Sequence, residues 1–163
     1  MAAAAGFAGY YLNQSVLRAP PATEAAQRLM LAPLTDLSGK PQTLSRWRGK
    51  VLIVNFWATW CTPCREEIPE LMKIQEKQRA NGVEIVGIAI DNASKVRDYG
   101  NEMHINYSLL VGGAETLAIS RDLGNQAGVL PFTVVMGRSG NVAFVHAGAL
   151  TEAALGPVLA KLL

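Results

Sequence analysis

The chain of 163 residues has the length of one compact domain, and its 50% hydrophobic and 17% charged residues supply ample material for a core. This composition argues against disorder away from the ends of the chain. The formal net charge of +2 is spread along the chain, and the small basic cluster of Arg46, Arg48 and Lys50 sits in a predicted turn. Because the basic residues form no stripe, nucleic acid is not an expected partner.

The first dozen residues, MAAAAGFAGYYL, are small or apolar, and a polar stretch that contains proline follows from Asn13 to Thr23. This pattern is typical of the end of an export signal or membrane anchor. It is shorter than the roughly 20 apolar residues that span a bilayer, and no basic segment precedes it. The alternative is the frayed start of a cytosolic protein. We expect residues 1–25 to be a remnant of a signal or anchor with its linker, followed by one domain over residues 29–163.

The sequence of the first half of the domain predicts a hairpin, a strand and a helix. Residues 31–47 alternate around the turn signal Ser38-Gly39-Lys40-Pro41, which indicates a short antiparallel hairpin. Residues 51–58, VLIVNFWA, form a nearly continuous apolar run, which is typical of a strand covered on both faces. From Thr62 to about Asn81 the apolar residues recur at helical spacing, and Asn81-Gly82 ends the pattern.

A second apolar run, residues 83–90, directly follows that helix and predicts a parallel strand connected by a right-handed crossover. Helices are expected over residues 91–103 and 114–123. Residues 132–136 and 142–147 flank a turn with two glycines, which indicates a β-hairpin, and a final helix begins at Thr151. The predicted fold class is therefore α/β, with a central mixed sheet flanked by helices.

The only two cysteines, Cys61 and Cys64, lie three positions apart in the stretch WCTPC. A structural disulfide here would close a minimal loop and would add little stability. A zinc site would need two more ligands, and the candidates His104 and His146 are single residues far apart in sequence. The third interpretation is a redox-active dithiol, which the position between a buried strand and a helix favours.

Helix geometry assigns different roles to the two sulfurs. Cys61 is expected at the helix N-terminus, where unpaired N–H groups and the helix dipole favour a thiolate, so it is the predicted nucleophile. Cys64 lies one turn further on the apolar face, where it is shielded from water, and is the predicted resolving thiol. Pro63 fits the first helical turn, because no N–H bond is lost there.

The segment VLIVNFWATWCTPCREEIP resembles the active-site segment of the thioredoxin superfamily, and specifically that of the TlpA/ResA-like membrane-anchored thiol-disulfide oxidoreductases. The resemblance covers about residues 30–163. It implies a thioredoxin-like fold with an N-terminal β-hairpin and a central insert between Asp91 and Leu123. It also implies a periplasmic protein that is tethered to the inner membrane or exported.

Asn55 stands where cytosolic thioredoxin has a buried aspartate that helps to deprotonate the resolving thiol, and an asparagine cannot take up a proton. Glu67 lies one helical turn after Cys64 and matches a glutamate of ResA-like proteins, so it is the predicted base. The alternative is that Glu67 is a surface acid like Glu66 and Glu70. Helix geometry argues against this alternative, because residues 64, 67, 68 and 71 share one face.

Pro131 matches the cis-proline of the family, and Leu130 before it offers its backbone to an extended substrate. A trans proline at the start of an edge strand is the alternative. We expect Trp60 to lie at the surface beside the sulfurs and Trp57 to pack in the core. Trp60, Thr62, Pro63, Leu130 and Pro131 are the predicted substrate-binding residues.

These features predict a protein-disulfide oxidoreductase, and the Thr62-Pro63 pair resembles that of reducing family members. By resemblance, the expected partners are dithiol or disulfide proteins such as apocytochrome c or a copper chaperone, together with a membrane electron donor. We expect a monomer that needs no bound metal or organic cofactor. An alternative is a copper(I) carrier that uses the same two thiolates. A thiol peroxidase is disfavoured, because Ala58 and Val54 stand where it would need threonine and proline.

Overall fold

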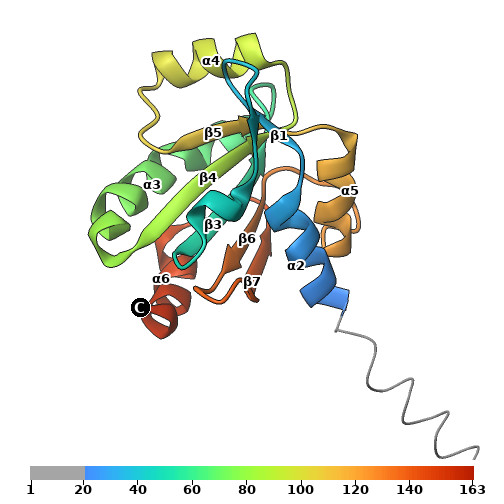
Figure 1. The fold of residues 1–163 in the computed structure, drawn as a ribbon. Helices are drawn as coiled ribbons and strands as arrows, with labels where there is room; N and C mark the ends of the chain where they lie inside the picture. The colour runs from blue at the N-terminus through green and yellow to red at the C-terminus, as the bar shows by residue number, and fades with distance from the viewer. Residues whose placement is uncertain (1–20) are drawn as a thin grey trace, which may run out of the picture.

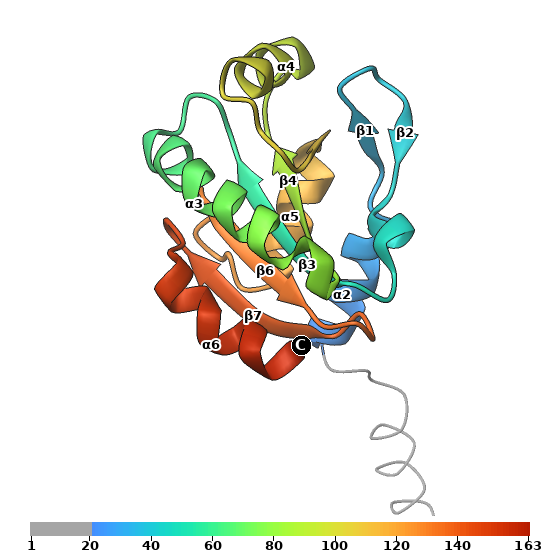
Figure 2. The same ribbon diagram turned by 90° about the vertical axis from the view of Figure 1, so that its left-hand side faces the viewer.

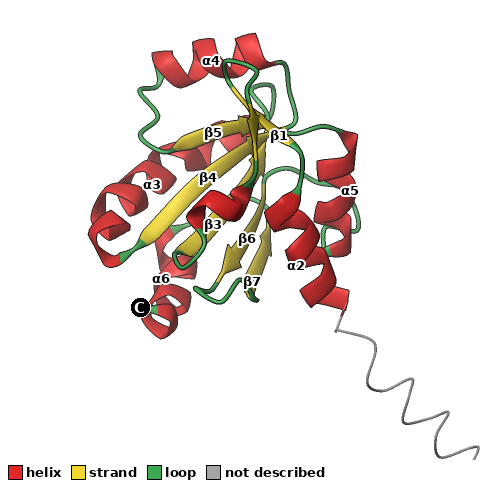
Figure 3. Ribbon diagram, viewed as in Figure 1, coloured by secondary structure: helices red, strands yellow, loops and turns green. Residues whose placement is uncertain are grey.

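A computed structural model describes residues 21–163, which contain one mixed sheet with helices on both faces (Figures 1 and 3). The strand order is β2-β1-β5-β4-β3-β6-β7. The strands are β1 (Leu34–Asp36), β2 (Pro41–Gln42), β3 (Val51–Trp57), β4 (Val83–Ala89), β5 (Ser108–Val111), β6 (Phe132–Met136) and β7 (Val142–Ala147). The α-helices are α2 (Pro21–Leu31), α3 (Thr62–Gln78), α4 (Ala93–Glu102), α5 (Ala114–Asp122) and α6 (Glu152–Leu162), and the 3-10 helices are η1 (Leu44–Trp47) and η2 (Arg79–Asn81).

Strand β3 lies at the centre, and its seven residues are all buried, as the apolar run predicted. It pairs in parallel with β4, with Asn55 opposite Gly87, and in antiparallel with β6, with Asn55 opposite Thr133. The crossover between β3 and β4 is α3, which passes through η2 to Gly82 in the left-handed conformation, with a φ of 81°. Both predicted hairpins are present, β1–β2 and β6–β7.

The alternating residues of β3 separate two layers of packing. Leu52, Val54 and Phe56 pack with residues of α2, η1 and α5 on one face. Val51 and Ile53 pack with residues of α3 and α6 on the other face. Figure 1 shows this arrangement, with α3 and α6 on one side of the sheet and α2 and α5 on the other. In the side view the β1–β2 hairpin extends from the body of the molecule (Figure 2).

Apart from the two short 3-10 helices, strand β5 and helix α2 were not expected from the sequence. Strand β5 lies within the predicted central insert, where it pairs in parallel with β4 and in antiparallel with β1. Helix α2 begins at Pro21, and its residues Ala25, Ala26 and Leu29 are buried in the core. Packing therefore extends on the N-terminal side of Leu29, where the domain was expected to begin.

The predicted signal or anchor remnant falls mainly on residues 1–20, which lie outside the described part of the chain. Within residues 21–163, no helix combines the length and apolar character that crossing a membrane requires.

Gln75 connects α3 to a part of β4 that pairs with β3 on one side but has no neighbouring strand on the other. The β4–β5 pairing begins only at Val86, so the preceding residues of β4 lie beyond the first residue of β5 and have no partner strand on that side. The fully buried Gln75 side chain fills this position, because its Oε1 accepts from the N–H of Ile85 at 2.6 Å and its Nε2 donates to the carbonyl of Val83 at 3.4 Å. A side chain thus replaces the missing strand.

We expect Gln75→Leu to lower the free energy of unfolding by about 1 to 3 kcal/mol, because it leaves a buried backbone N–H without a partner. Urea unfolding of the oxidised protein measures this loss. The matched control is Gln27→Leu, at an exposed position of α2. Equal losses in the two variants would contradict the role assigned to Gln75.

Candidate active site

The two cysteines form a disulfide at the start of α3. The Cys61–Cys64 bond has an S–S distance of 2.05 Å, and Cys61 is the N-cap of the helix, where its Sγ accepts from the backbone N–H of Cys64 at 3.3 Å. Cys64 has no exposed surface, whereas Cys61 is 6% exposed. The sulfur that a partner can approach is therefore the one that faces the N-terminal N–H groups of the helix.

The loop between β3 and α3 is held by the end of β4. Asp91 follows β4, and its Oδ2 accepts from both the backbone N–H and the hydroxyl of Thr59, two residues before Cys61. Burial acts to raise the pKa of Asp91, but the bonds from Thr59, a backbone N–H of Asn92 and the charge of Lys95 together keep it below its usual range. The dithiol loop is thus attached at the carboxyl end of the neighbouring parallel strand.

Glu67 is buried on the face of α3 that packs against the sheet, and it is 2% exposed. Its Oε1 accepts from Asn55 Nδ2 at 2.6 Å, and its Oε2 accepts from the backbone N–H of Leu150 at 2.8 Å. Burial raises the pKa of Glu67 to about 7, although these two donors act in the opposite direction. The carboxyl group can therefore exist in either protonation state near neutral pH.

The acids beside Glu67 differ from it in environment. Glu66 is exposed, and Glu70 is partly exposed and forms an ion pair with Lys73 on the same helix. The structure thus agrees with the helix geometry that separated Glu67 from its neighbours.

The loop before β6 lies against the dithiol. The Leu130–Pro131 peptide bond is cis, as the resemblance implied, and Leu130 packs against the apolar cluster that contains Cys61 and Cys64. The buried side chain of Asn125 shapes this loop, because it accepts from the N–H of Val129 and donates to the carbonyl of Val129, both at 2.9 Å. Sequence reasoning did not identify Asn125, since an asparagine directly after a glycine that ends a helix reads as part of an ordinary turn.

The surface around Cys61 contains exposed side chains from two segments. Trp60 is 68% exposed, and Thr62 and Pro63 are also exposed, whereas Trp57 is fully buried, as expected. Val129 is 43% exposed on the neighbouring loop. The predicted site residues are therefore distributed over the β3–α3 junction and the loop before β6.

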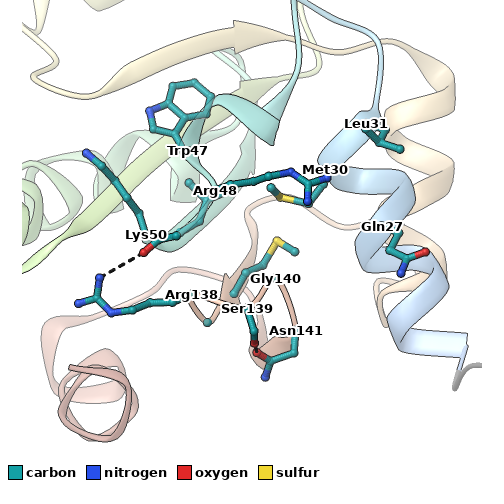
Figure 4. Close-up of a pocket in the computed structure, with 14 residues that line it drawn as sticks. Gln27, Met30, Leu31, Trp47, Arg48, Lys50, Arg138, Ser139, Gly140 and Asn141 are labelled. Carbon is teal, nitrogen blue, oxygen red and sulfur yellow. Dashed lines mark hydrogen bonds between the residues drawn. The ribbon is translucent and has the colours of Figure 1, made fainter.

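A cavity of about 480 Å³ lies elsewhere, between η1 and the β6–β7 turn (Figure 4). Arg48, Lys50 and Arg138 line it, and Arg138 donates to the carbonyl of Gly49 across it. It is located at the end of β3 opposite to the dithiol and contains none of the predicted site residues. Within residues 21–163, no three His, Cys, Asp or Glu side chains are grouped to hold a metal ion.

Comparisons with known proteins agree with this geometry. The Redoxin family pattern matches residues 17–159. The chain belongs to the Redoxin family. It is 28% identical over 120 residues to the thiol-disulfide oxidoreductase ResA of Geobacillus kaustophilus, an alignment that covers 73% of this chain and 67% of that protein.

Two solved structures resemble this member of the Redoxin family. A thiol:disulfide interchange protein of Chlorobium tepidum is 31% identical, with a TM-score of 0.69, over 80% of this chain and 94% of that one. A secreted thiol-disulfide isomerase of Corynebacterium glutamicum is 27% identical, with a TM-score of 0.69, over 79% of this chain and 81% of that one. The predicted resemblance to ResA-like proteins and the predicted thioredoxin-like fold are confirmed.

The raised pKa of Glu67 makes the stability of this Redoxin protein depend on pH. Between the ordinary value of 4.5 and about 7, the folded state holds a proton that the unfolded chain has released. Stability from this group is therefore complete below pH 4.5 and is lost as the pH rises to about 7, a change of about 3 kcal/mol. We expect the unfolding free energy of the wild type to fall by this amount relative to Glu67→Gln.

Urea unfolding of both oxidised proteins across this pH range measures the difference. Parallel curves for the two proteins would contradict the elevated pKa.

Proposed function

We propose that this protein is a thiol-disulfide reductase for other proteins that acts through Cys61 and Cys64. The observation that carries this proposal is a disulfide at a helix N-terminus, with one shielded sulfur and a buried carboxyl group one turn further along the same helix. The names of the ResA relative and of the two similar solved structures support the same class of enzyme, protein-disulfide oxidoreductase.

In the reduced form, the Cys61 thiolate attacks one sulfur of a partner disulfide. A mixed disulfide forms, and the other partner sulfur leaves as a thiolate. Cys64 then gives its proton to Glu67 and attacks Cys61 Sγ, which closes the Cys61–Cys64 bond and releases the second partner thiolate. Two electrons pass from the dithiol to the partner, and an external thiol donor restores the reduced form.

The exposed surface beside Cys61 is suited to an extended partner segment. Trp60 offers a large apolar face, and Thr62 and Pro63 lie next to the nucleophile. Leu130 precedes the cis-proline and offers its backbone for pairing with a substrate strand. We assign substrate binding to these residues together with Pro131.

We further propose that the protein acts outside the cytoplasm, in the periplasm. The support is the apolar sequence of residues 1–12 and the secreted relative from Corynebacterium glutamicum. A tether formed by this segment would restrict the enzyme to clients near the membrane, such as apocytochrome c or the thiols of copper-site assembly, and would bring it close to a membrane electron donor.

A trapping experiment tests the proposed reaction and identifies the client. Cys64→Ser, expressed in the native compartment, should accumulate disulfide-linked complexes through Cys61 that a reductant releases, because the second step is blocked. Cys61→Ser is the matched control and should trap nothing. Non-reducing electrophoresis followed by mass spectrometry reads the result.

A copper(I) titration of the reduced wild type separates the reductase from the alternative carrier function. The carrier function would be supported if copper binds tightly and stoichiometrically, insulin disulfides are not reduced and the Cys64→Ser trap stays empty. These results together would contradict the proposed reductase function.

The role of Glu67 has a separate test. We expect Glu67→Gln to slow the closing of the Cys61–Cys64 disulfide about 10- to 100-fold near neutral pH, because the proton of Cys64 loses its acceptor. Stopped-flow measurement of product release from a mixed disulfide gives this rate. Glu66→Gln, which alters a neighbouring exposed acid, is the control. A rate that matches the wild type from about pH 5 to about pH 9 would remove Glu67 from the mechanism.

A further inference from the structure

His146 forms a hydrogen bond with a peptide group that also contacts the buried carboxyl group of Glu67. It lies on β7 opposite Thr133, and its ring stacks on Phe144 with a centroid distance of 6.1 Å and an interplanar angle of 15°. Its Nε2 is 3.2 Å from the carbonyl oxygen of Ala149. Since a carbonyl oxygen only accepts, Nε2 carries the hydrogen and donates it.

The carbonyl of Ala149 and the N–H of Leu150 are the two ends of one peptide group. The same N–H donates to Glu67 Oε2 at 2.8 Å. A single peptide group therefore separates the half-buried imidazole from the buried carboxylate. Hydrogen bonds at the two ends of an amide strengthen each other, because a donor at the oxygen makes the N–H a better donor.

The other carboxyl oxygen of Glu67, Oε1, is connected to the strand pair that carries His146. Asn55 Nδ2 donates to Glu67 Oε1 at 2.6 Å and to Thr133 Oγ1 at 3.1 Å. Thr133 is the residue paired with His146 across the β6–β7 hairpin. The carboxyl group is thus held from β3 on one side and from the loop after β7 on the other, and the β6–β7 pairing joins the two holders.

The groups that face Glu67 from the surrounding elements carry no positive charge. The phenol of Tyr107, just before β5, is buried nearby, and its pKa is raised by burial and by the charge of Glu67. Cys64 lies on the same helix and is bonded to Cys61. The ion pairs found within residues 21–163 do not include Glu67, and the Lys77–Glu152 pair between α3 and α6 is at the surface. Neutral N–H donors therefore stabilise the ionised carboxyl group of Glu67.

We propose that His146 is a positioning residue for Glu67, acting through the Ala149–Leu150 peptide group. The imidazole holds this peptide with its N–H directed at Oε2 and so favours the ionised carboxyl group. Without the imidazole N–H, the peptide donates more weakly, and Glu67 retains its proton to higher pH. The effect on thiol exchange rests on the proposed role of Glu67 as the proton acceptor, whereas the positioning itself does not.

Titration of the Glu67 side-chain carbon by ¹³C NMR in the oxidised protein tests the proposal directly, with Glu67→Gln used to assign the signal. His146→Phe keeps a ring on Phe144 but has no N–H. We expect its titration midpoint to rise by about 0.5 to 1 pH unit, a gain in proton affinity of about three- to tenfold. His146→Gln supplies a new amide donor and should recover part of the shift.

The matched control is His104→Asn, which changes the only other histidine of the chain. His104 is exposed before β5 and has a φ of 51°, a conformation that asparagine tolerates. We expect this variant to titrate like the wild type. An unmoved midpoint in His146→Phe, or an equal shift in His146→Gln, would overturn the proposal.

The rate of disulfide closing provides the second measurement. Its pH profile should move with the carboxyl titration in His146→Phe. If the carboxyl midpoint moves and the rate profile does not, His146 still positions Glu67, but the proposed part of Glu67 in thiol exchange fails.

Discussion

Glu67 places an ionisable group in the buried layer between α3 and the sheet, and the surrounding elements are arranged so that this burial is tolerated. Transfer of a carboxylate from water into such a site is costly unless each oxygen finds a donor. One donor comes from Asn55 in the central strand and the other from Leu150 in the loop before α6. The site therefore depends on the correct packing of α3 and of the β7–α6 connection onto the sheet.

Asn55 makes this arrangement favour the anion without contributing a second acid. Both amide hydrogens are used, one for Glu67 and one for Thr133, while Asn55 Oδ1 is buried without a partner among the described residues. An aspartate here would place a second carboxylate next to the first, and the two would share a proton at neutral pH. An asparagine in the strand is thus the natural companion of a glutamate in the helix.

The sequence predicted most of the fold because its strongest signals are local. The apolar runs of β3 and β4, the spacing of Cys64, Ile68 and Leu71, and the glycines of the β6–β7 turn each report the structure of their own segment. Strand β5 is only four residues long, and its pairing with β4 and β1 is a tertiary property. Helix α2 was missed because its alanine-rich start resembles the N-terminal segment that precedes it.

The residues of the candidate site likewise divide into those that local sequence patterns predict and those that only the fold brings together. The positions of Cys61, Cys64 and Glu67 on the helix follow from spacing, and Pro131 follows from a family pattern. The partners of Glu67 do not. A backbone N–H such as that of Leu150 leaves no trace in the sequence, and His146 contacts the network only through a peptide carbonyl. Side-chain identity reveals the reacting groups more readily than the groups that hold them.

The need for a buried base follows from where a partner would bind in the proposed cycle. Trp60 is exposed directly before Cys61, and Val129 is exposed on the loop whose Leu130 packs against the cysteine cluster. In the proposed cycle, a partner docked on this surface covers the open side of the disulfide and excludes water from it. Cys64 has no exposed surface in the disulfide form even without a partner, so direct transfer of its proton to solvent is disfavoured in the proposed cycle. In the proposed cycle this proton leaves toward the interior, where Glu67, with a pKa of about 7, accepts it near neutral pH and later releases it.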